Sequence, residues 1–390
     1  MKAELSDRIK NLPPEKLDLL LKQLKPGAKL HGGAAAPARP GKHYFREAED
    51  HNFYLNAETP GVLESLRFSA RERLPLEPHH LEVEMYAAGL NFRDVAVALG
   101  MYPMPPCGIM PELGCDGAGK VVAVGKNVTG FQVGDEVFCL TCDSSFSRYT
   151  RTREVTAFPK PPGCSFEEVA GLALIYITVV YSLRVPGRLL KGERILIHSA
   201  AGGIGLAAVQ MAQKIGAEIF ATAGTEEKRE YLRSLGIPHV MDSHSLGWVE
   251  EILDLTHGEG IDVVLNSLFG EAIEGGFRLL RPDGRFIELG KRDLLPGRKF
   301  ELSDFTRALV FAAVDTSYLF ALWPERLFPI MKEIRDDFAS GALKPLPTKS
   351  YRPSEVVEAF RYMTTGKHIG RIAVTLKGEP IQVNRSLAAS

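Results

Sequence analysis

A short glycine-rich stretch between two apolar segments constrains the fold of this chain more than any other feature. Residues 195–200, ILIHSA, have the composition of a strand. Residues 204–216, IGLAAVQMAQKIG, repeat small and apolar side chains at helical spacing, and Gly216 is placed to end that helix. A strand, a turn of small residues and a helix are typical of a dinucleotide site, because N–H groups at the helix start point at the pyrophosphate.

Three further apolar runs follow, each with a helix-length segment behind it: EIFATA (218–223), DVVLNSL (262–268) and RFIELG (285–290). Such alternation predicts a parallel sheet with crossover helices. A turn that only packs two elements together could contain the same glycines. The surrounding strands and helix favour a dinucleotide site instead, formed by Ala201, Gly202, Gly203, Ile204 and Gly205.

The end of the second strand selects between the two nicotinamide dinucleotides. NAD sites usually carry Asp or Glu at this strand end, about 20 residues after the glycine-rich turn, to bind the ribose 2′-hydroxyl. Here Thr222, Ala223 and Gly224 take that place, and Lys228 follows. A missing carboxylate and an added cation suit a 2′-phosphate, so the sequence predicts NADPH. Lys228 alone could be a solvated helix lysine, and the missing acid carries more of the prediction.

The composition bounds the function classes. A chain of 390 residues is long for one core, which favours two domains. Because 47 basic residues balance 48 acidic ones, we expect no global attraction to nucleic acid or anionic membranes. No apolar run reaches the roughly 18–20 uncharged residues of a membrane span. Five scattered cysteines and a charged N-terminus favour a reducing compartment, so we expect a cytoplasmic protein.

The pattern of expected strands and helices changes along the chain. Leucines at helical spacing near the N-terminus predict either a frayed extension or a small docking helix. The block from about 42 to 165 looks all-β, the block after 166 alternates strands and helices, and RIAVTL (371–376) is expected to be the last strand. We expect a helical segment (1–25), a linker (26–42), a β-rich domain (43–165), a dinucleotide-binding domain (166–314), a return to the β-rich domain (315–379) and a tail (380–390).

No metal site is expected. The pair CLTC (139–142) has the spacing of metal ligands, but structural zinc needs four, and no second pair accompanies it. We therefore predict two buried thiols. A nicotinamide site needs no metal if the protein polarises the substrate by other means. Lys291 directly follows Gly290 at the end of a strand, and on position alone it is equally a catalytic donor or a surface lysine.

Over residues 45–378 these segments resemble the medium-chain dehydrogenase/reductase superfamily, whose GroES-like β-rich domain precedes a Rossmann doubly wound parallel sheet. In its zinc alcohol dehydrogenases a Gly-His-Glu triplet opens the segment that corresponds to GCDGAGKVVAVG (114–125). Here Cys115 replaces the histidine and Asp116 the glutamate, and the lobe for structural zinc is absent. The resemblance therefore implies the zinc-free branch.

Four motifs within that branch are similar to the enoyl reductase domains of modular polyketide synthases and animal-type fatty acid synthases. They are AAGLNFRDVAVALGMYP (87–103), ILIHSAAGGIGLAAVQMAQKIGAEIFATAG (195–224), GIDVVLNSLFGE (260–271) and GRFIELGKRD (284–293). Tyr102 matches a tyrosine associated with proton delivery and α-branch configuration, Lys291 matches the active-site lysine, and Asp315 matches less securely an aspartate paired with it. The resemblance places Asn91 and the loop Asn266, Ser267 and Leu268 beside the nicotinamide, and Gly290 is a further candidate for cofactor binding.

The resemblance implies an NADPH-dependent, zinc-independent reductase of trans-2-enoyl thioesters carried by an acyl carrier protein. Residues 1–25 loosely resemble segments that dock to a polyketide synthase module. A quinone or enone reductase of the same fold and a non-catalytic NADPH-binding protein are the alternatives. Acyl chain, stereochemistry, proton donor, reductive ring closure and the choice between monomer and homodimer stay open.

Overall fold

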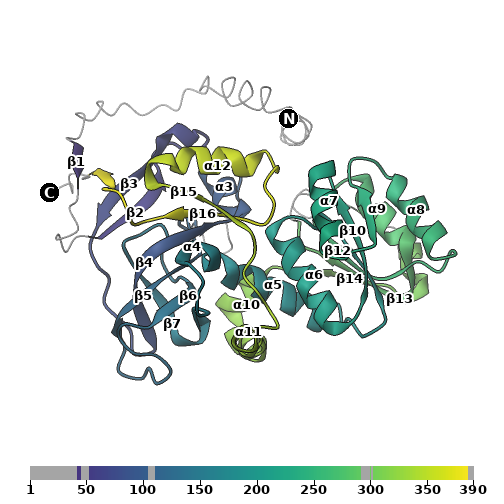
Figure 1. Ribbon diagram of the computed structural model, residues 1–390, viewed down its shortest axis with the longest axis horizontal. Helices are drawn as coiled ribbons and strands as arrows, with labels where there is room; N and C mark the ends of the chain where they lie inside the picture. The colour runs from purple at the N-terminus through teal and green to yellow at the C-terminus, as the bar shows by residue number, and fades with distance from the viewer. Residues whose placement is uncertain (1–41, 45–51, 104–109, 291–298, 300–301, 385–390) are drawn as a thin grey trace.

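The computed structural model describes residues 42–44, 52–103, 110–290, 299 and 302–384, which form two lobes (Figure 1). Each lobe is built on its own large sheet. The predicted N-terminal helical segment, most of the predicted linker and Lys291 lie outside the described residues.

A six-stranded sheet forms the lobe that contains the glycine turn. Its order is β11-β10-β9-β12-β13-β14, and every neighbouring pair is parallel. The strands are β9 (Arg194–Ile197), β10 (Glu218–Ala223), β11 (His239–Asp242), β12 (Ile261–Asn266), β13 (Leu280–Glu288) and β14 (Val310–Ala313). The order reverses between β9 and β12, and doubly wound sheets bind their ligands at such a reversal. The predicted parallel sheet is confirmed.

Crossover helices join these strands, as the alternation predicted (Figure 1). They are α6 (Gly203–Ile215), α7 (Glu226–Ser234), α8 (Gly247–Leu255) and α9 (Glu271–Leu279), and the 3-10 turn η3 (Leu302–Arg307) precedes β14. The inner face of α6 is buried at Ala207, Ala208, Met211 and Ala212. Gly216 ends α6 in the left-handed conformation with φ +84°, which confirms the predicted cap.

The second lobe contains a seven-stranded sheet. Its strands are β4 (His80–Leu90), β5 (Asp116–Val124), β6 (Glu136–Leu140), β7 (Tyr149–Arg153), β8 (Ala157–Pro159), β15 (Thr348–Tyr351) and β16 (Arg371–Thr375). The central strand β4 pairs with β5, β7 and β16, and nearly all of its residues are buried. Leu81, Val83 and Met85 alternate along β4 and are fully buried, whereas Glu84 and Tyr86 between them are partly buried.

This lobe also contains a four-stranded sheet in the order β1-β17-β3-β2. Its strands are β1 (Lys42–Tyr44), β2 (Asn52–Ala57), β3 (Leu66–Arg71) and β17 (Gln382–Asn384). The expectation that RIAVTL is the last strand is wrong, since β17 follows β16 and pairs with both β1 and β3. This region was expected to be all-β, yet NFRDV begins the helix α3 (Phe92–Ala98).

The remaining helices lie around and between the lobes (Figure 1). They are α10 (Thr316–Leu322), α11 (Phe328–Ser340) and α12 (Val356–Thr364), with the 3-10 turns η1 (Leu63–Ser65), η2 (Glu154–Thr156), η4 (Pro324–Leu327) and η5 (Pro353–Glu355). Helix α11 packs on the helix that starts at Leu172, and α12 packs on α3 and β16. The C-terminal part of the chain therefore contacts both lobes.

The apolar stretch after Ser165 forms two helices rather than one. Ser165 caps α4 (Phe166–Val169) through a capping box, and α5 (Leu172–Arg184) starts after Gly171 in the left-handed conformation. Residues 166–184 are long and apolar enough to cross a membrane, but 67% of that stretch is buried inside the protein. Its side chains join a core shared by both lobes, which includes Phe138, Tyr176 and Ala208. This stretch is therefore a core element.

Candidate active site

The glycine turn lies at the carboxyl end of β9, where the strand order reverses. Gly202 N donates to Ser199 O over 3.0 Å, and Leu206 N donates to Gly202 O over 2.8 Å. A Cβ on Gly205 would lie 2.4–2.6 Å from three backbone atoms of Ala200. Only glycine lets the first turn of α6 pack so closely on the end of β9.

The start of α6 fits the phosphates of a dinucleotide. No side chain caps this helix at Gly202, so its first N–H groups have no side-chain acceptor there. Arg371 lies beside Gly203, because a Cβ there would meet the arginine Cδ at 2.5 Å and Nη1 at 3.4 Å. A helix N-terminus and a guanidinium group at one point favour the binding of a pyrophosphate.

The end of β10 contains no carboxylate. Thr222 is buried and its hydroxyl lies 2.9 Å from His198 Nδ1, while Ala223 O accepts from Arg229 Nη1 over 3.1 Å. A Cβ on Gly224 would meet the ring of His244 at 2.8 Å. Asp242 ends the neighbouring strand β11 and lies 3.3 Å from Arg229. Arg229 and His244 are thus two basic groups near the predicted ribose position that the sequence did not single out.

Lys228 is half-buried in the first turn of α7. Its Nζ donates to Gly366 O of the other lobe over 2.6 Å. Burial lowers the pKa of Lys228, and the neighbouring Glu227 opposes this shift. Lys228 is therefore partly buried where the two lobes meet, and its role at a 2′-phosphate stays a prediction.

The buried Glu288 connects the loop at 266–268 to Gly290 through hydrogen bonds. Glu288 ends β13 and accepts from Asn266 Nδ2 over 2.6 Å and from Gly290 N over 2.5 Å. Asn266 also donates to Leu268 O over 2.9 Å and accepts from Leu268 N over 3.1 Å. Ser267 Oγ donates to His198 O over 3.4 Å, which links the loop to the end of β9. These residues therefore form one hydrogen-bonded unit along the carboxyl edge of the sheet.

A buried polar cluster joins the second lobe to the glycine turn. Asn91 Nδ2 donates to Asp116 Oδ1 over 2.7 Å, and Arg371 Nη2 donates to Asn91 Oδ1 over 3.0 Å. Asp116 Oδ2 also accepts from Leu174 N over 3.3 Å. Burial raises the pKa of Asp116, while Arg371 and the Asn91 hydrogen bond lower it. Asn91 is thus held in a fixed orientation beside the start of α6.

Cys115 and Asp94 complete this cluster. Asn91 Nδ2 lies 3.4 Å from Cys115 Sγ, and Asp94 accepts from Gly114 N over 2.9 Å and from Asn91 N over 2.9 Å. Burial raises the pKa of the Cys115 thiol well above its usual value, against the influence of Arg93. A protonated thiol is a poor metal ligand and a poor nucleophile. Burial therefore favours the protonated thiol at Cys115.

Of the three residues carried over as catalytic, the structure describes Tyr102 and Asp315. Tyr102 is half-buried after α3, with its N–H donating to Ala96 O over 3.0 Å, and its side chain interacts electrostatically with Arg93. Asp315 caps α10 and accepts from Ser317 N over 3.0 Å. Ala313 pairs with Glu288 across β14 and β13, so Gly290 and Asp315 follow the ends of neighbouring strands. The pairing of Lys291 with Asp315 stays a prediction, since Lys291 lies outside the described residues.

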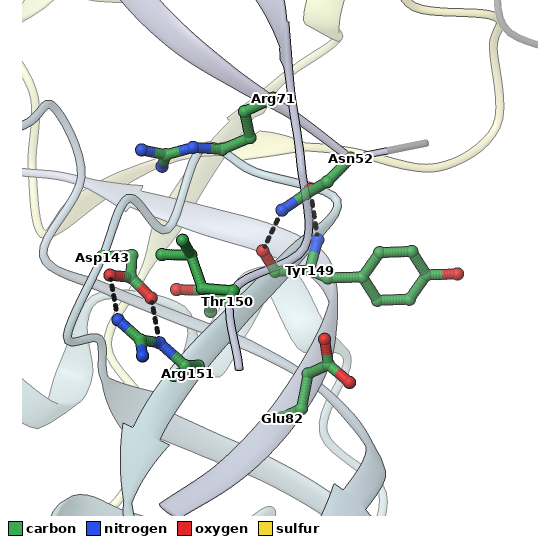
Figure 2. Close-up of a pocket in the computed structure, with 8 residues that line it drawn as sticks. Asn52, Arg71, Glu82, Asp143, Tyr149, Thr150 and Arg151 are labelled. Carbon is green, nitrogen blue, oxygen red and sulfur yellow. Dashed lines mark hydrogen bonds and ion pairs between the residues drawn. The ribbon is translucent and has the colours of Figure 1, made fainter. Parts of the chain in front are cut away.

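A separate polar pocket lies in the second lobe, away from the glycine turn (Figure 2). Its lining comes mainly from β2, β3, β4 and β7, and Asn52 and Tyr149 bond each other through two hydrogen bonds of 2.8 and 2.9 Å. Arg151 pairs with Asp143 over 2.9 Å. Arg71 pairs with Glu112 and Glu82 with Arg73, both outside the lining, so each charged group is paired and we assign no ligand to this pocket.

Within the described ranges no group of three or more His, Cys, Asp or Glu side chains could hold a metal ion. Cys139 is buried, as predicted, but Cys142 is exposed. The prediction of two buried thiols is wrong for Cys142, which lies in the loop after β6. Neither cysteine is part of the cluster around Asn91.

We expect the buried His198 to make folding sensitive to acid. Burial lowers the pKa of His198 to about 3, and its Nε2 has no hydrogen-bond partner among the described residues. Because the unfolded chain takes up a proton near pH 6.5 and the folded chain does not, stability should fall as the pH drops below about 6.5. We expect this histidine alone to lower the free energy of unfolding by roughly 2 kcal/mol between pH 7 and pH 5.

Urea unfolding at both pH values checks this expectation. His198→Gln should lose less stability than the wild-type chain between pH 7 and pH 5, whereas His79→Gln, at an exposed histidine, should behave like the wild type. An identical pH effect in all three proteins would contradict the assignment.

Comparison with known proteins places this geometry in a family. The model of the alcohol dehydrogenase GroES-like domain matches residues 77–182, and the model of the zinc-binding dehydrogenase domain matches residues 203–314. The solved CurK enoyl reductase is 39% identical with a TM-score of 0.78, and the match covers 84% of this chain and 99% of that one. This chain belongs to the enoyl reductases of the medium-chain dehydrogenase/reductase superfamily. Its fold is the GroES-like and Rossmann pair that the sequence predicted.

Relatives of this enoyl reductase are parts of large synthases. The chain is 40% identical over 322 residues to a phenolphthiocerol/phthiocerol polyketide synthase of Mycobacterium tuberculosis. That match covers 83% of this chain but only 15% of the synthase. The CurF ER cyclopropanase from the curacin A biosynthetic pathway is 35% identical with a TM-score of 0.75, covering 83% of this chain and 99% of that one.

A more distant relative was solved with a cofactor. The Escherichia coli quinone oxidoreductase complexed with NADPH is 26% identical with a TM-score of 0.69, and the match covers 83% of this chain and 99% of that one. Nicotinamide-dependent oxidoreduction is therefore common to this family.

Sequence reasoning missed the residues that hold the site together. Arg371, Glu288 and His198 are all buried and bond to predicted site residues. Arg371 offered one weak signal, as a charged residue at the start of an apolar strand. Glu288 offered the same signal at the end of RFIE. A charge inside a buried strand requires a partner, but the sequence does not name that partner.

Proposed function

We propose that this enoyl reductase uses NADPH to reduce the α,β double bond of a trans-2-enoyl thioester bound to an acyl carrier protein. The observation that carries the cofactor assignment is the end of β10, where Thr222, Ala223 and Gly224 replace the acid of an NAD site and Lys228 lies half-buried nearby. The substrate assignment rests on the similarity to enoyl reductase regions of polyketide synthases.

The proposed cofactor site follows the carboxyl edge of the six-stranded sheet. The start of α6, from Ala201 to Gly205, and Arg371 would hold the pyrophosphate. The loop at 266–268 and Gly290, fixed by Glu288, would flank the nicotinamide together with Asn91. When bound, the cofactor supplies a hydride for the β-carbon of the substrate.

The protein supplies charge stabilisation and a proton. Hydride addition leaves the electron pair on the thioester oxygen as an enolate, and Lys291 or backbone N–H groups would stabilise this oxyanion by a few kcal/mol each. Tyr102, Lys291 or water then gives the proton to the α-carbon, which completes a saturated thioester. Asp315 would keep Lys291 charged if the two side chains pair. No metal takes part in this proposal.

Two substitutions test the catalytic residues. Lys291→Ala and Tyr102→Phe are expected to slow enoyl reduction by about ten-fold or more, or to scramble the α-configuration, because each removes a donor used in the transition state. Neither should weaken NADPH binding. Stopped-flow oxidation of NADPH and chiral analysis of an α-methyl product measure both effects.

The exposed Lys299 offers a matched control, and Lys299→Ala should leave rate and configuration unchanged. Wild-type rate and configuration in both test variants would remove Lys291 and Tyr102 from the mechanism.

One panel of substrates tests two other reactions against the proposed one. A quinone reductase is the second candidate, since a quinone oxidoreductase shares the fold. Reductive ring closure on a halogenated enoyl chain is the third, because the CurF cyclopropanase is a relative. Mass spectrometry of products from enoyl-pantetheine, carrier-bound enoyl, halogenated enoyl and quinone substrates separates them. Faster turnover of the quinone than of every thioester would overturn the proposed substrate.

The synthase context supplies the proposed partners. We infer that an acyl carrier protein delivers the substrate in the cytoplasm, and that residues 1–25 dock to a polyketide synthase module. The relatives that contain similar regions are multidomain synthases, which supports this context. We also propose the domain division at 43–165, 166–314 and 315–379, in which β15 and β16 return to the sheet of β4.

A further inference from the structure

The segment from Gly366 to Arg371, here called the crossing segment, runs from α7 to the glycine turn. At one end Gly366 O accepts from Lys228 Nζ over 2.6 Å. At the other end Gly370 N donates to Ala201 O over 2.8 Å, Gly370 pairs with Gly202, and Arg371 lies beside Gly203. The crossing segment therefore follows the path expected for a dinucleotide, from its adenosine ribose to its pyrophosphate.

His368 lies in the middle of the crossing segment. Its Nδ1 is buried and has no hydrogen-bond partner within the described part of the chain. Its ring lies 6.3 Å from the ring of Tyr362, measured between centroids. Lys228 on one side and Arg371 on the other both act electrostatically on this histidine. Lys228 of α7, His368 and Arg371 are thus close enough to interact electrostatically.

Other groups act on these three residues, among them Asp94 on Arg371. Glu227 acts on Lys228, Asp116 acts on Arg371, and Lys349 lies over the Tyr362 ring at 4.1 Å. Burial, Lys228 and Arg371 together lower the pKa of His368 to about 4, so the ring is neutral at pH 7. A dianionic phosphate between Lys228 and His368 would reverse this shift and protonate the ring.

We propose that His368 binds the 2′-phosphate of NADPH together with Lys228 and is a second determinant of cofactor specificity. This inference rests on the proposed use of NADPH. An ammonium group has three donors, so Lys228 can keep its bond to Gly366 O and still donate to a phosphate. His368 adds an N–H donor that becomes charged only when the phosphate is present. The histidine therefore favours the phosphorylated dinucleotide without adding a cation that NADH would also meet.

Binding of the oxidised cofactors to the full chain tests the proposal without turnover. His368→Gln should weaken NADP⁺ binding by about ten-fold, the range expected for a charge-assisted hydrogen bond, and leave NAD⁺ binding unchanged. His368→Lys, which keeps a cation at this position, should retain the preference for NADP⁺. Lys367→Ala removes an exposed charge from the same segment and should change neither affinity. Calorimetric titration measures all four proteins with both ligands.

A second readout uses the wild-type protein. In NMR titrations of the histidine ring protons, assigned with His368→Gln, the pKa of His368 should rise by more than one unit with NADP⁺ and stay low with NAD⁺. An equal loss of both affinities in His368→Gln, or an equal pKa with both ligands, would overturn the inference.

The outcome also separates this inference from the proposed function. A wild-type protein that binds NAD⁺ as tightly as NADP⁺ would overturn the NADPH assignment and the role of His368 together. A wild-type preference for NADP⁺ that survives in His368→Gln would overturn only the role of His368.

Discussion

Gly205→Ala should weaken NADPH binding by about a hundred-fold and lower the free energy of unfolding by about 1–3 kcal/mol. The added methyl carbon would lie 2.4–2.6 Å from the Cα, carbonyl carbon and oxygen of Ala200. The methyl carbon is fixed to the α6 backbone and the atoms it meets belong to the Ala200 backbone, so neither can rotate away. Helix α6 must therefore move off the end of β9. This movement displaces the N–H groups proposed to bind the pyrophosphate.

Fluorescence titration of NADPH and urea unfolding measure the two effects. Gly247→Ala is a matched control, because Gly247 also lies in the first turn of a helix and a Cβ there would meet only Ser245 Oγ at 3.4 Å. This control should keep wild-type affinity and stability. Unchanged NADPH affinity in Gly205→Ala would show that the glycine turn does not hold the cofactor.

Local patterns in the sequence predicted the parts of the fold that depend on neighbouring residues. The strand, turn and helix around Gly202 follow from composition and spacing, and Gly216 ends α6 where a left-handed residue was expected. The order of the sheet follows from the alternation of strands and helices and from the resemblance to a known family. The backbone that forms the proposed cofactor site was therefore predictable.

Contacts between distant residues were not predictable in the same way. The stretch after Ser165 has the composition of one helix, but it breaks at Gly171, where a Cβ would meet Arg371 Nη2 at 2.3 Å. Gly171 and Arg371 lie far apart in the chain, and no periodic pattern reports such a contact. Glu288, His198 and His368 were missed for a related reason, since each is recognised by what surrounds it rather than by its spacing.

Arg371→Met should lower the free energy of unfolding by about 3 kcal/mol or more, because it removes the cation from a buried cluster and leaves the Asp116 carboxylate there. Arg371 is 6% exposed and Asp116 is 0% exposed. Asn91 connects them, accepting from Arg371 and donating to Asp116. Burial lowers the pKa of Arg371 and raises that of Asp116, so each charge depends on the other.

A double substitution separates the buried charge from lost packing. Arg371→Met with Asp116→Asn should recover at least half of the lost stability, because no uncompensated carboxylate remains. Arg352→Met removes an exposed arginine, paired with Glu355, and should cost less than about 1 kcal/mol. If Arg371→Met unfolds at the same urea concentration as Arg352→Met, the cluster does not stabilise the junction between the lobes. NADPH affinity measured on the stable double variant then reports the contribution of Arg371 to the proposed pyrophosphate site.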